Sequence, residues 1–331
     1  MPELRLNLIT REWVIIQCER ARKPEEFAQR RERKYQPEHL DSCPFCPGNE
    51  QKTPGELVRI PSDGSWRVRV IPNKYAALLE EGDLLRTNEG HKHLVTGVGR
   101  HEVIVESPVH NMSTALFEIE QLTTILEMYK SRLVEAYKDD RVEHVIIFKN
   151  HGPSSGTSIL HPHSQLIGIP ITPIGIRNRM DEAMRFFDNT GECLLCAILK
   201  EDLAEGRRVV HETERFAAVI PYAALSPFHT WIVPKWHTAS LADCSGDDMK
   251  ELAGVLKATL HKFYHALDDP DYNYMIFTRG PFRYRSEYVH WYISIIPRVA
   301  PAAGFELGSG IYINHAIPED VAEYLRSVKV S

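Results

Sequence analysis

VIIFKNHGPSSGTSILHPHSQLIGIP at residues 145–170 and YMIFTRGPFRYRSEYVHWYISIIP at residues 274–297 follow one pattern. Each begins as an apolar strand, passes through a polar loop, and continues as a histidine-bearing strand that ends at a proline. The elements before both stretches also recur in order: a Cys-x-x-Cys pair, a strand, a proline, a strand and a long helix, at 114–138 and 248–267. This repeat predicts an α+β fold of two similar units, each an antiparallel sheet with one main helix.

The composition is that of a soluble globular protein. The chain has 331 residues, of which 43% are hydrophobic and 25% charged, with a formal net charge of −6. No apolar run reaches the roughly 18–20 residues that span a bilayer, and the first residues lack a basic start followed by an apolar core. We therefore expect a cytoplasmic protein without a membrane partner. The negative net charge argues against nucleic acid as a partner.

Four of the six cysteines form two Cys-x-x-Cys pairs, Cys43 with Cys46 and Cys193 with Cys196. In a cytosolic chain such pairs indicate metal sites or redox pairs rather than structural disulfides. A redox pair requires a thioredoxin-like context, which the surrounding sequence lacks. Metal binding is therefore the favoured interpretation of both pairs.

Two histidines, His161 and His163, are separated by one residue on a predicted strand, so their side chains point to the same face. The loop before them, GPSSGTS at residues 152–158, can approach a phosphate closely and offer backbone N–H and hydroxyl donors. Neutral imidazole is nucleophilic at one nitrogen while the other keeps a proton. The combination predicts phosphoryl or nucleotidyl transfer, and the alternative is a His-x-His metal face or a packed core feature.

The motif His161-Pro-His163-Ser-Gln165 behind Ser-Gly-Thr-Ser resembles the active-site signature of the galactose-1-phosphate uridylyltransferases, a branch of the histidine-triad superfamily. Further matches are spread over almost the whole chain: Glu12-Trp13-Val14, Arg20-Ala-Arg-Lys-Pro24, Cys43-Pro-Phe-Cys-Pro-Gly-Asn49, Ser107-Pro-x-His110, Asn150-x-Gly152 and Pro227-Phe-His-x3-Val-Pro234-Lys-x-His237. The resemblance implies two fused histidine-triad-like units. Residues 1–180 would carry the nucleophile and the first metal site, and residues 181–331 the second metal site and a sugar-binding tail.

By its place in the motif, His163 resembles the nucleophile that attacks the α-phosphorus of a nucleoside diphosphate sugar and holds the nucleotide covalently. A hexose 1-phosphate then reverses the step, which gives ping-pong kinetics. Gln165 resembles the residue that hydrogen-bonds the transferred phosphoryl group, where histidine-triad hydrolases have a third histidine. The resemblance also implies a phosphate-contacting hydroxyl, Ser158, and seven substrate-binding residues: Arg20, Lys23 (arginine in the family), Asn73, Asn150, Gly156, Glu306 and Asn314.

The resemblance implies two zinc sites. The first set is Cys43, Cys46, His110 and His161, two thiolates and two imidazoles that suit a closed, structural zinc. The second set is Cys193, Cys196, a middle histidine and His290. For the middle position His237 fits better than His229, because it follows a strand and a proline as His110 does. Iron is not expected, since Ser294 and Ile296 stand where iron-containing members carry histidines.

The nucleotide and the sugar are left open by the sequence. Uridylyltransferases commonly show Asn-Asp-aromatic at the base and ribose pocket, and this chain has Asn73-Lys74-Tyr75. The tail from Gly304 to Asn314 resembles that of the two-zinc members, which include ADP-glucose phosphorylases. The first hypothesis is a uridylyltransferase that exchanges UMP between UDP-glucose and galactose 1-phosphate. The second is an adenylyl enzyme that phosphorolyses ADP-glucose or a dinucleoside polyphosphate, and the third is a non-catalytic, zinc-stabilised nucleotide-binding protein. The resemblance implies a homodimer.

Overall fold

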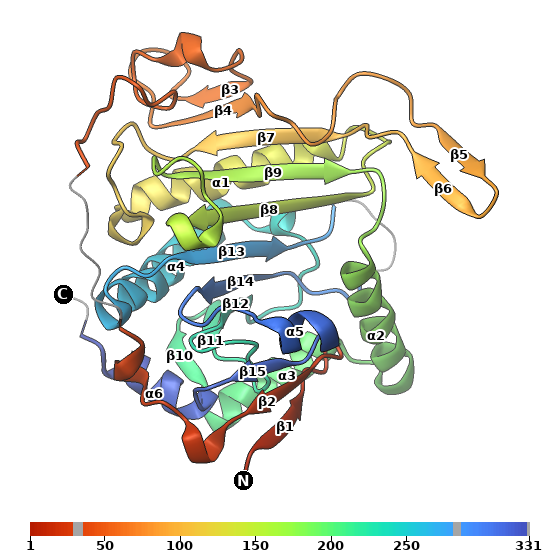
Figure 1. The fold of residues 1–331 in the computed structure, drawn as a ribbon, viewed down its shortest axis with the longest axis vertical. Helices are drawn as coiled ribbons and strands as arrows, with labels where there is room; N and C mark the ends of the chain where they lie inside the picture. Colours follow the sequence, from red (N-terminus) through yellow and green to blue (C-terminus); the bar gives the residue numbers. More distant parts are fainter. Residues whose placement is uncertain (29–35, 281–285, 330–331) are drawn as a thin grey trace.

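The computed structural model describes residues 1–28, 36–280 and 286–329, so residues 281–285 of the second repeated stretch lie outside the described residues. Its centre is one ten-stranded antiparallel sheet in the order β10-β11-β12-β14-β13-β8-β9-β7-β4-β3 (Figure 1). The strands are β3 (Val58–Ile60), β4 (Val68–Pro72), β7 (Arg100–Val105), β8 (His144–His151), β9 (His163–Ile169), β10 (Val209–Glu212), β11 (Phe216–Val219), β12 (Thr230–Pro234), β13 (Tyr272–Phe277) and β14 (Tyr292–Pro297).

The sheet is made of two halves with the same internal order, which confirms the repeat. In each half the strand after the main helix is innermost, the histidine-bearing strand lies beside it, and three earlier strands follow outward. The halves join where β8 pairs with β13, with Asn150 opposite Asn273. The predicted α+β fold of two antiparallel units is thus observed, and the two half-sheets are continuous. The boundary predicted at residue 180 lies within helix α2 (Ile174–Thr190) and stays a prediction.

The two main helices cover one face of the sheet. They are α1 (Ile119–Ala136) and α4 (Gly246–Leu267), and they pack against each other. In α1 the apolar residues recur at helical spacing, so that Leu122, Leu126 and Leu133 all face the core. Helix α4 begins at a capping box in which Ser245 and Asp248 exchange side-chain and backbone hydrogen bonds. The main hydrophobic core therefore lies between these helices and the sheet.

The opposite face carries the remaining elements. Helices α2 and α3 (Leu194–Glu205) cover the second half of it, and α3 has no counterpart in the elements expected from the sequence. The N-terminal strands β1 (Glu3–Leu6) and β2 (Trp13–Ile16) form a small sheet with β15 (Tyr312–Asn314) near the C-terminus. Helices α5 (Gly304–Ser309) and α6 (Pro318–Ser327) flank β15 in sequence.

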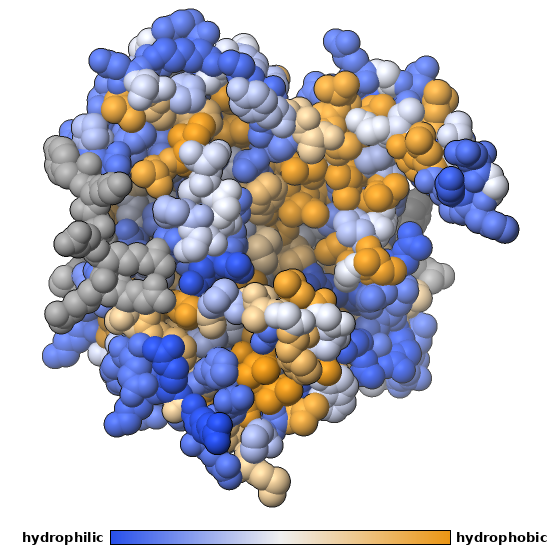
Figure 2. Space-filling model, viewed as in Figure 1, coloured by the Kyte–Doolittle hydropathy of each residue, from blue (hydrophilic) through white to orange (hydrophobic). Residues whose placement is uncertain are grey.

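A two-stranded hairpin, β5 (Arg86–Glu89) and β6 (Lys92–Val95), projects from the body as an arm (Figure 1). In the space-filling view, hydrophobic side chains gather in the middle of the molecule and near the base of this arm (Figure 2). Among the described residues, no helix is both long and apolar enough to cross a membrane.

Candidate active site and metal clusters

The first Cys-x-x-Cys pair meets two histidines from other parts of the first unit. The ligand atoms of Cys43, Cys46, His110 and His161 all lie within 4.8 Å of one another, and all four residues are buried. The Cys46 sulfur lies 3.6 Å from Nδ1 of each histidine. Two thiols and two imidazoles at this spacing can hold a tetrahedral metal ion, which is consistent with zinc.

A backbone carbonyl orients the imidazole of His161. Its Nε2 donates to the carbonyl oxygen of Ser107 at 2.6 Å, which leaves Nδ1 with a lone pair facing the sulfur atoms. Burial lowers the pKa of His161 to about 3, so the ring is neutral, as a metal ligand must be. Burial raises the pKa of Cys43 to about 11, so a metal that binds its thiolate displaces a proton.

The second unit builds a similar cluster. The ligand atoms of Cys193, Cys196, His237 and His290 also lie within 4.8 Å of one another, and Nδ1 of each histidine lies 3.5 Å (His237) or 3.2 Å (His290) from the Cys196 sulfur. His229 lies elsewhere: it is buried, and its Nε2 contacts the hydroxyl of Ser294 at 2.8 Å. The structure therefore brings together the set with His237 and leaves the alternative His229 outside it.

His163 lies two residues beyond His161 of the first cluster, at the start of β9. Its Nδ1 is 2.8 Å from the carbonyl oxygen of His161. A carbonyl only accepts, so Nδ1 carries the proton and Nε2 carries the free lone pair. The ring of Phe45, which lies between the two cysteines of the first pair, packs edge-on at 5.2 Å against His163. The loop that carries Cys43 and Cys46 therefore also contacts the predicted nucleophile.

A buried ion pair lies beneath His163, on the face that the helices cover. The Nζ of Lys149 contacts the carboxylate of Glu106 and donates to the backbone carbonyl of His163 at 3.1 Å. Tyr129 donates a further hydrogen bond to Glu106 at 2.7 Å. Burial lowers the pKa of His163, and the nearby ammonium of Lys149 lowers it further. The imidazole is therefore held in its neutral, nucleophilic form at neutral pH.

Gln165 shares a sheet face with His163, because the two residues are separated by one position on β9. Its Oε1 lies 2.8 Å from Nε2 of His101 and 3.3 Å from Nδ2 of Asn73. The structure thus places the predicted phosphoryl-binding residue next to Asn73, which the sequence assigned to the nucleotide pocket. The sequence did not single out His101. The chain has 16 histidines, and this one belongs to no recognisable motif.

The glycine-rich loop after β8 is held by residues of the second unit. Asn273 donates from Nδ2 to Oδ1 of Asn150 at 2.7 Å and to the carbonyl of Ser155 at 2.9 Å. The carboxylate of Asp271 accepts from the backbone N–H of Ser154 at 2.7 Å. A Cβ on Gly152, where φ is +81°, would meet Asp271 at 1.9 Å, so this position requires glycine. The second unit therefore shapes the loop that would cradle a phosphate.

This geometry can be compared with known proteins. The N-terminal domain model of galactose-1-phosphate uridyl transferase matches residues 1–173, and the C-terminal domain model matches residues 179–293. The chain belongs to the galactose-1-phosphate uridylyltransferase family. This is a family of nucleotidyltransferases, and the sequence-based assignment to it is confirmed.

Members of the family align over the whole chain. An ADP-glucose phosphorylase from Arabidopsis thaliana is 37% identical over 100% of this chain and 94% of its own length. A galactose-1-phosphate uridylyltransferase from Thermotoga maritima is 28% identical over 100% of this chain and 99% of its own. The crystal structure of an ADP-glucose phosphorylase from Arabidopsis thaliana with bound ADP-glucose superimposes with a TM-score of 0.84 at 34% identity, covering both chains completely.

Four residues that the resemblance assigned to substrate have no hydrogen bond to His163 or Gln165 among those described, and their substrate roles stay predictions. Arg20 and Lys23 are exposed, and the short helix that begins beside Lys23 packs against α4 and α6. Glu306 accepts from the backbone N–H of Ala303 at 2.9 Å and so caps its own helix. Asn314 is buried, and its amide bonds the carbonyl of Ala224 and the N–H of Ala316, each at 2.9 Å. These two bonds hold the Asn314 amide against the backbone of the second unit.

Ser158 and Gly156 are exposed in the loop between β8 and β9, where a ligand could reach them. Among the hydrogen bonds that the structure describes, none involves the hydroxyl of Ser158. Their roles toward phosphate stay predictions of the family resemblance.

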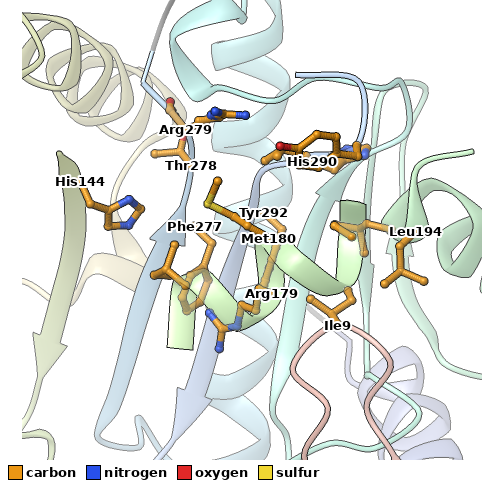
Figure 3. A pocket seen from close by; sticks show the side chains of 15 residues that line it. Ile9, His144, Arg179, Met180, Leu194, Phe277, Thr278, Arg279, His290 and Tyr292 are labelled. Atoms are coloured by element: carbon orange, nitrogen blue, oxygen red, sulfur yellow. The ribbon is translucent and has the colours of Figure 1, made fainter. Parts of the chain in front are cut away.

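A cavity of about 90 Å³ lies between helices α2 and α3 and the strands β13 and β14 (Figure 3). Phe277, Tyr292 and Met180 give it an apolar lining, and the guanidinium of Arg179 lies 4.1 Å from the centre of the Phe277 ring. Of the residues proposed for chemistry or metal binding, its described lining includes His290 alone. The cavity is therefore separate from the nucleophile.

Proposed function

We propose that this protein transfers a nucleotidyl group from a nucleotide sugar by way of a covalent intermediate on Nε2 of His163. The observation that carries the proposal is the hydrogen bond from Nδ1 of His163 to the carbonyl of His161, which leaves Nε2 unprotonated and nucleophilic. The lone pair of Nε2 attacks the α-phosphorus, the bond from that phosphorus to the bridging oxygen breaks, and the sugar 1-phosphate leaves with the electron pair. Attack by an acceptor phosphate on the same phosphorus then breaks the N–P bond and restores His163.

The neighbouring residues support both half-reactions. Gln165 would hydrogen-bond the transferred phosphoryl group, and a neutral amide stabilises charge there without activating water. Ser158 and the backbone of the loop at Gly156 would contact the phosphates, while Asn73 and Asn150 would border the nucleotide. Burial and Lys149 keep His163 neutral, so the nucleophile needs no base to activate it.

We propose zinc for both clusters, because each set of two thiols and two imidazoles fits a closed tetrahedral site without a position for substrate. Zinc would supply structural rigidity. In the first cluster Cys43, Cys46, His110 and His161 would fix the start of β9 and the Phe45 ring against His163. In the second, Cys193, Cys196, His237 and His290 would fix the start of α3 to the strand β14.

ADP-glucose is the substrate that we propose first, with inorganic phosphate as the acceptor. The 37% identity to an ADP-glucose phosphorylase over the whole chain supports it, as does the likeness to a structure with bound ADP-glucose. Lys74 also stands where uridylyltransferases commonly have an acidic residue. This reverses the order of the two enzymatic hypotheses that the sequence alone gave.

Exchange of UMP between UDP-glucose and galactose 1-phosphate is the second candidate. The galactose-1-phosphate uridylyltransferase from Thermotoga maritima, 28% identical over the full length of both chains, supports it. A purely nucleotide-binding role is disfavoured, because His163 and Gln165 are both present and lie on one face of β9. A homodimer and a cytoplasmic location stay part of the proposal; in a homodimer the exposed Arg20 and Lys23 could reach the site of the other subunit.

Covalent labelling tests the proposal. The protein is incubated separately with ADP-glucose and UDP-glucose labelled in the α-phosphate and quenched in base, where phosphohistidine survives. Label from ADP-glucose that inorganic phosphate discharges as labelled ADP supports the phosphorylase. Label from UDP-glucose that galactose 1-phosphate discharges supports the uridylyltransferase. Absence of label from both, in protein with two zinc ions per chain, would overturn the covalent mechanism.

A further inference from the structure

His101 connects the loop at Asn73 to the amide of Gln165. It lies on β7, next to β9, and its backbone carbonyl accepts from the N–H of Asn73 at 2.8 Å. Its ring nitrogens contact two further groups: Nδ1 lies 3.0 Å from the backbone nitrogen of Ala77, and Nε2 lies 2.8 Å from Oε1 of Gln165. One side chain therefore joins the segment 73–77 to the residue that would bind the transferred group.

The partners of His101 fix its tautomer. The backbone N–H of Ala77 can only donate, so Nδ1 of His101 must accept and cannot carry the proton. In the neutral ring the proton is then on Nε2, which donates to Gln165. The atom of Gln165 that faces His101 must therefore be the carbonyl oxygen.

Asn73 reinforces this orientation of Gln165. Its Oδ1 accepts from the backbone N–H of Tyr75 at 2.8 Å, so its amide nitrogen is the end that faces Gln165, at 3.3 Å. The two donor nitrogens of Asn73 and His101 lie 3.0 Å apart and converge on the same oxygen. No hydrogen bond from the amide nitrogen of Gln165 is found within the described part of the chain. That nitrogen is thus free to donate to a ligand.

We propose that His101 is a positioning residue that locks the amide of Gln165 with its nitrogen toward the transferred phosphoryl group. The proposal rests on the proposed function and adds a residue that lies outside the His161–Gln165 motif. If the amide turned over, its carbonyl oxygen would face the phosphoryl oxygens and repel them. Two donors on Oε1 prevent this, because a turned amide would place its own N–H groups against Nε2 of His101 and Nδ2 of Asn73.

Two conservative variants separate this role from a merely structural one. In His101→Gln the new amide nitrogen takes the place of Nε2, so the donor to Gln165 is kept and the acceptor for Ala77 is lost. In His101→Asn the shorter amide takes the place of Nδ1, so the acceptor for Ala77 is kept and the donor to Gln165 is lost. We expect His101→Asn to slow the labelling of His163 by roughly 10- to 100-fold. His101→Gln should stay within about threefold of the wild type, with the melting temperature and zinc content of both variants unchanged.

A double-mutant cycle then tests whether His101 acts through Gln165. Adding His101→Asn to Gln165→Ala should slow labelling no further, because the residue to be oriented is absent. His93→Ala, on the exposed β5–β6 arm, is the matched control and should label like the wild type. If the histidine variants do not fold, Asn73→Ala removes the other donor to the same oxygen and is put through the same cycle.

The outcomes distinguish the two levels of the proposal. Wild-type protein that takes no label at His163 from either nucleotide sugar overturns the proposed function. If the wild type is labelled and His101→Asn is labelled at the same rate, the positioning role alone is overturned. A larger loss of labelling rate in His101→Gln than in His101→Asn also overturns it. Additive losses in the cycle with Gln165→Ala also overturn it.

Discussion

In the first unit the strand after the cluster histidine His161 carries His163 and Gln165, whereas the strand after His290 in the second unit carries Tyr292 and Ser294. The equivalence follows from the clusters, because His163 and Tyr292 each begin their strand two residues after His161 or His290. Tyr292 packs against the rings of Phe277 and Trp231, each at 5.0 Å. Where the first unit has an imidazole whose Nε2 carries a free lone pair, the second has a packed aromatic cluster.

The two clusters also differ in how they are supported. All four residues of the first are buried, and His161 donates to the carbonyl of Ser107. In the second, His237 is exposed, and Nε2 of the buried His290 has no hydrogen-bond partner in the described part of the chain. Both units thus share the Cys/His cluster, and they differ at the two positions to which we assign the chemistry, His163 and Gln165.

The largest effect on turnover should come from substituting the residue that follows each cluster histidine by two positions, His163 in the first unit and Tyr292 in the second. His163→Gly removes the nucleophile, so we expect covalent labelling to disappear and turnover to fall by roughly 10³- to 10⁶-fold. Tyr292→Phe, at the matching position of the second unit, should change turnover by less than about twofold. Labelling and steady-state assays on both variants check this, and a His163→Gly variant that still accepts label would refute the assignment.

The next largest effect on turnover should come from removing a cysteine from one cluster, and it should differ between the two clusters. Cys46→Ser removes one thiolate from the cluster beside His163 and should lower both the melting temperature and turnover, the latter by roughly 10- to 100-fold. Cys196→Ser should lower the melting temperature while turnover changes by less than about threefold. Each variant should retain one of two zinc ions by elemental analysis. Equal loss of turnover in the two variants would contradict the division of roles.

A smaller effect should follow from breaking the contact between the units at the phosphate loop. Asn273→Ala removes two hydrogen bonds, to Asn150 and to the carbonyl of Ser155, and we expect turnover to fall by roughly 5- to 10-fold. Asn88→Ala on the β5–β6 arm serves as the control. If Asn273→Ala turned over substrate at the wild-type rate, the second unit would not be needed to shape the loop.

The smallest effect concerns pH. Burial lowers the pKa of His163 below its ordinary value of 6.5, so the nucleophile stays deprotonated as the pH falls through that value. The labelling rate should therefore drop by less than about twofold between pH 7.5 and 6.5, with its acid limb centred below 6.5. Single-turnover labelling across pH 5–8 measures this, and Tyr292→Phe should give the same curve. A midpoint above pH 6.5 would show that the imidazole is not held neutral.

Local signals made several predictions accurate. The apolar spacing at 114–138 and 248–267 predicted the two main helices, observed as α1 and α4, because a helix that packs on a sheet must bury one stripe. The repeat predicted the shared strand order. The family resemblance predicted the residues that form both clusters. The sequence did not reveal α3, which begins within the second Cys-x-x-Cys pair, where only a metal site was expected.

The sequence could not predict the contacts of residues that belong to no motif. His101, Lys149 and Glu106 contact partners that are distant in the chain; Glu106 and Lys149, for example, are 43 positions apart. An isolated histidine or a Lys and Glu pair has no local pattern that distinguishes it from surface charge. Conversely, Glu306 and Asn314 had a family motif but bond their own backbone neighbourhood in this structure.

The sequence alone was enough to find the two-unit repeat, the family and the Cys and His members of both clusters, because these depend on residue type and short spacing. It also proposed His163 and Gln165 for the chemistry. Only the tertiary structure decided that His237 rather than His229 completes the second cluster, and that both half-sheets form one continuous sheet. It also decided the tautomer of His163 and the orientation of the Gln165 amide. Those properties depend on which donor faces which acceptor across neighbouring strands, and that is a matter of register rather than of residue order.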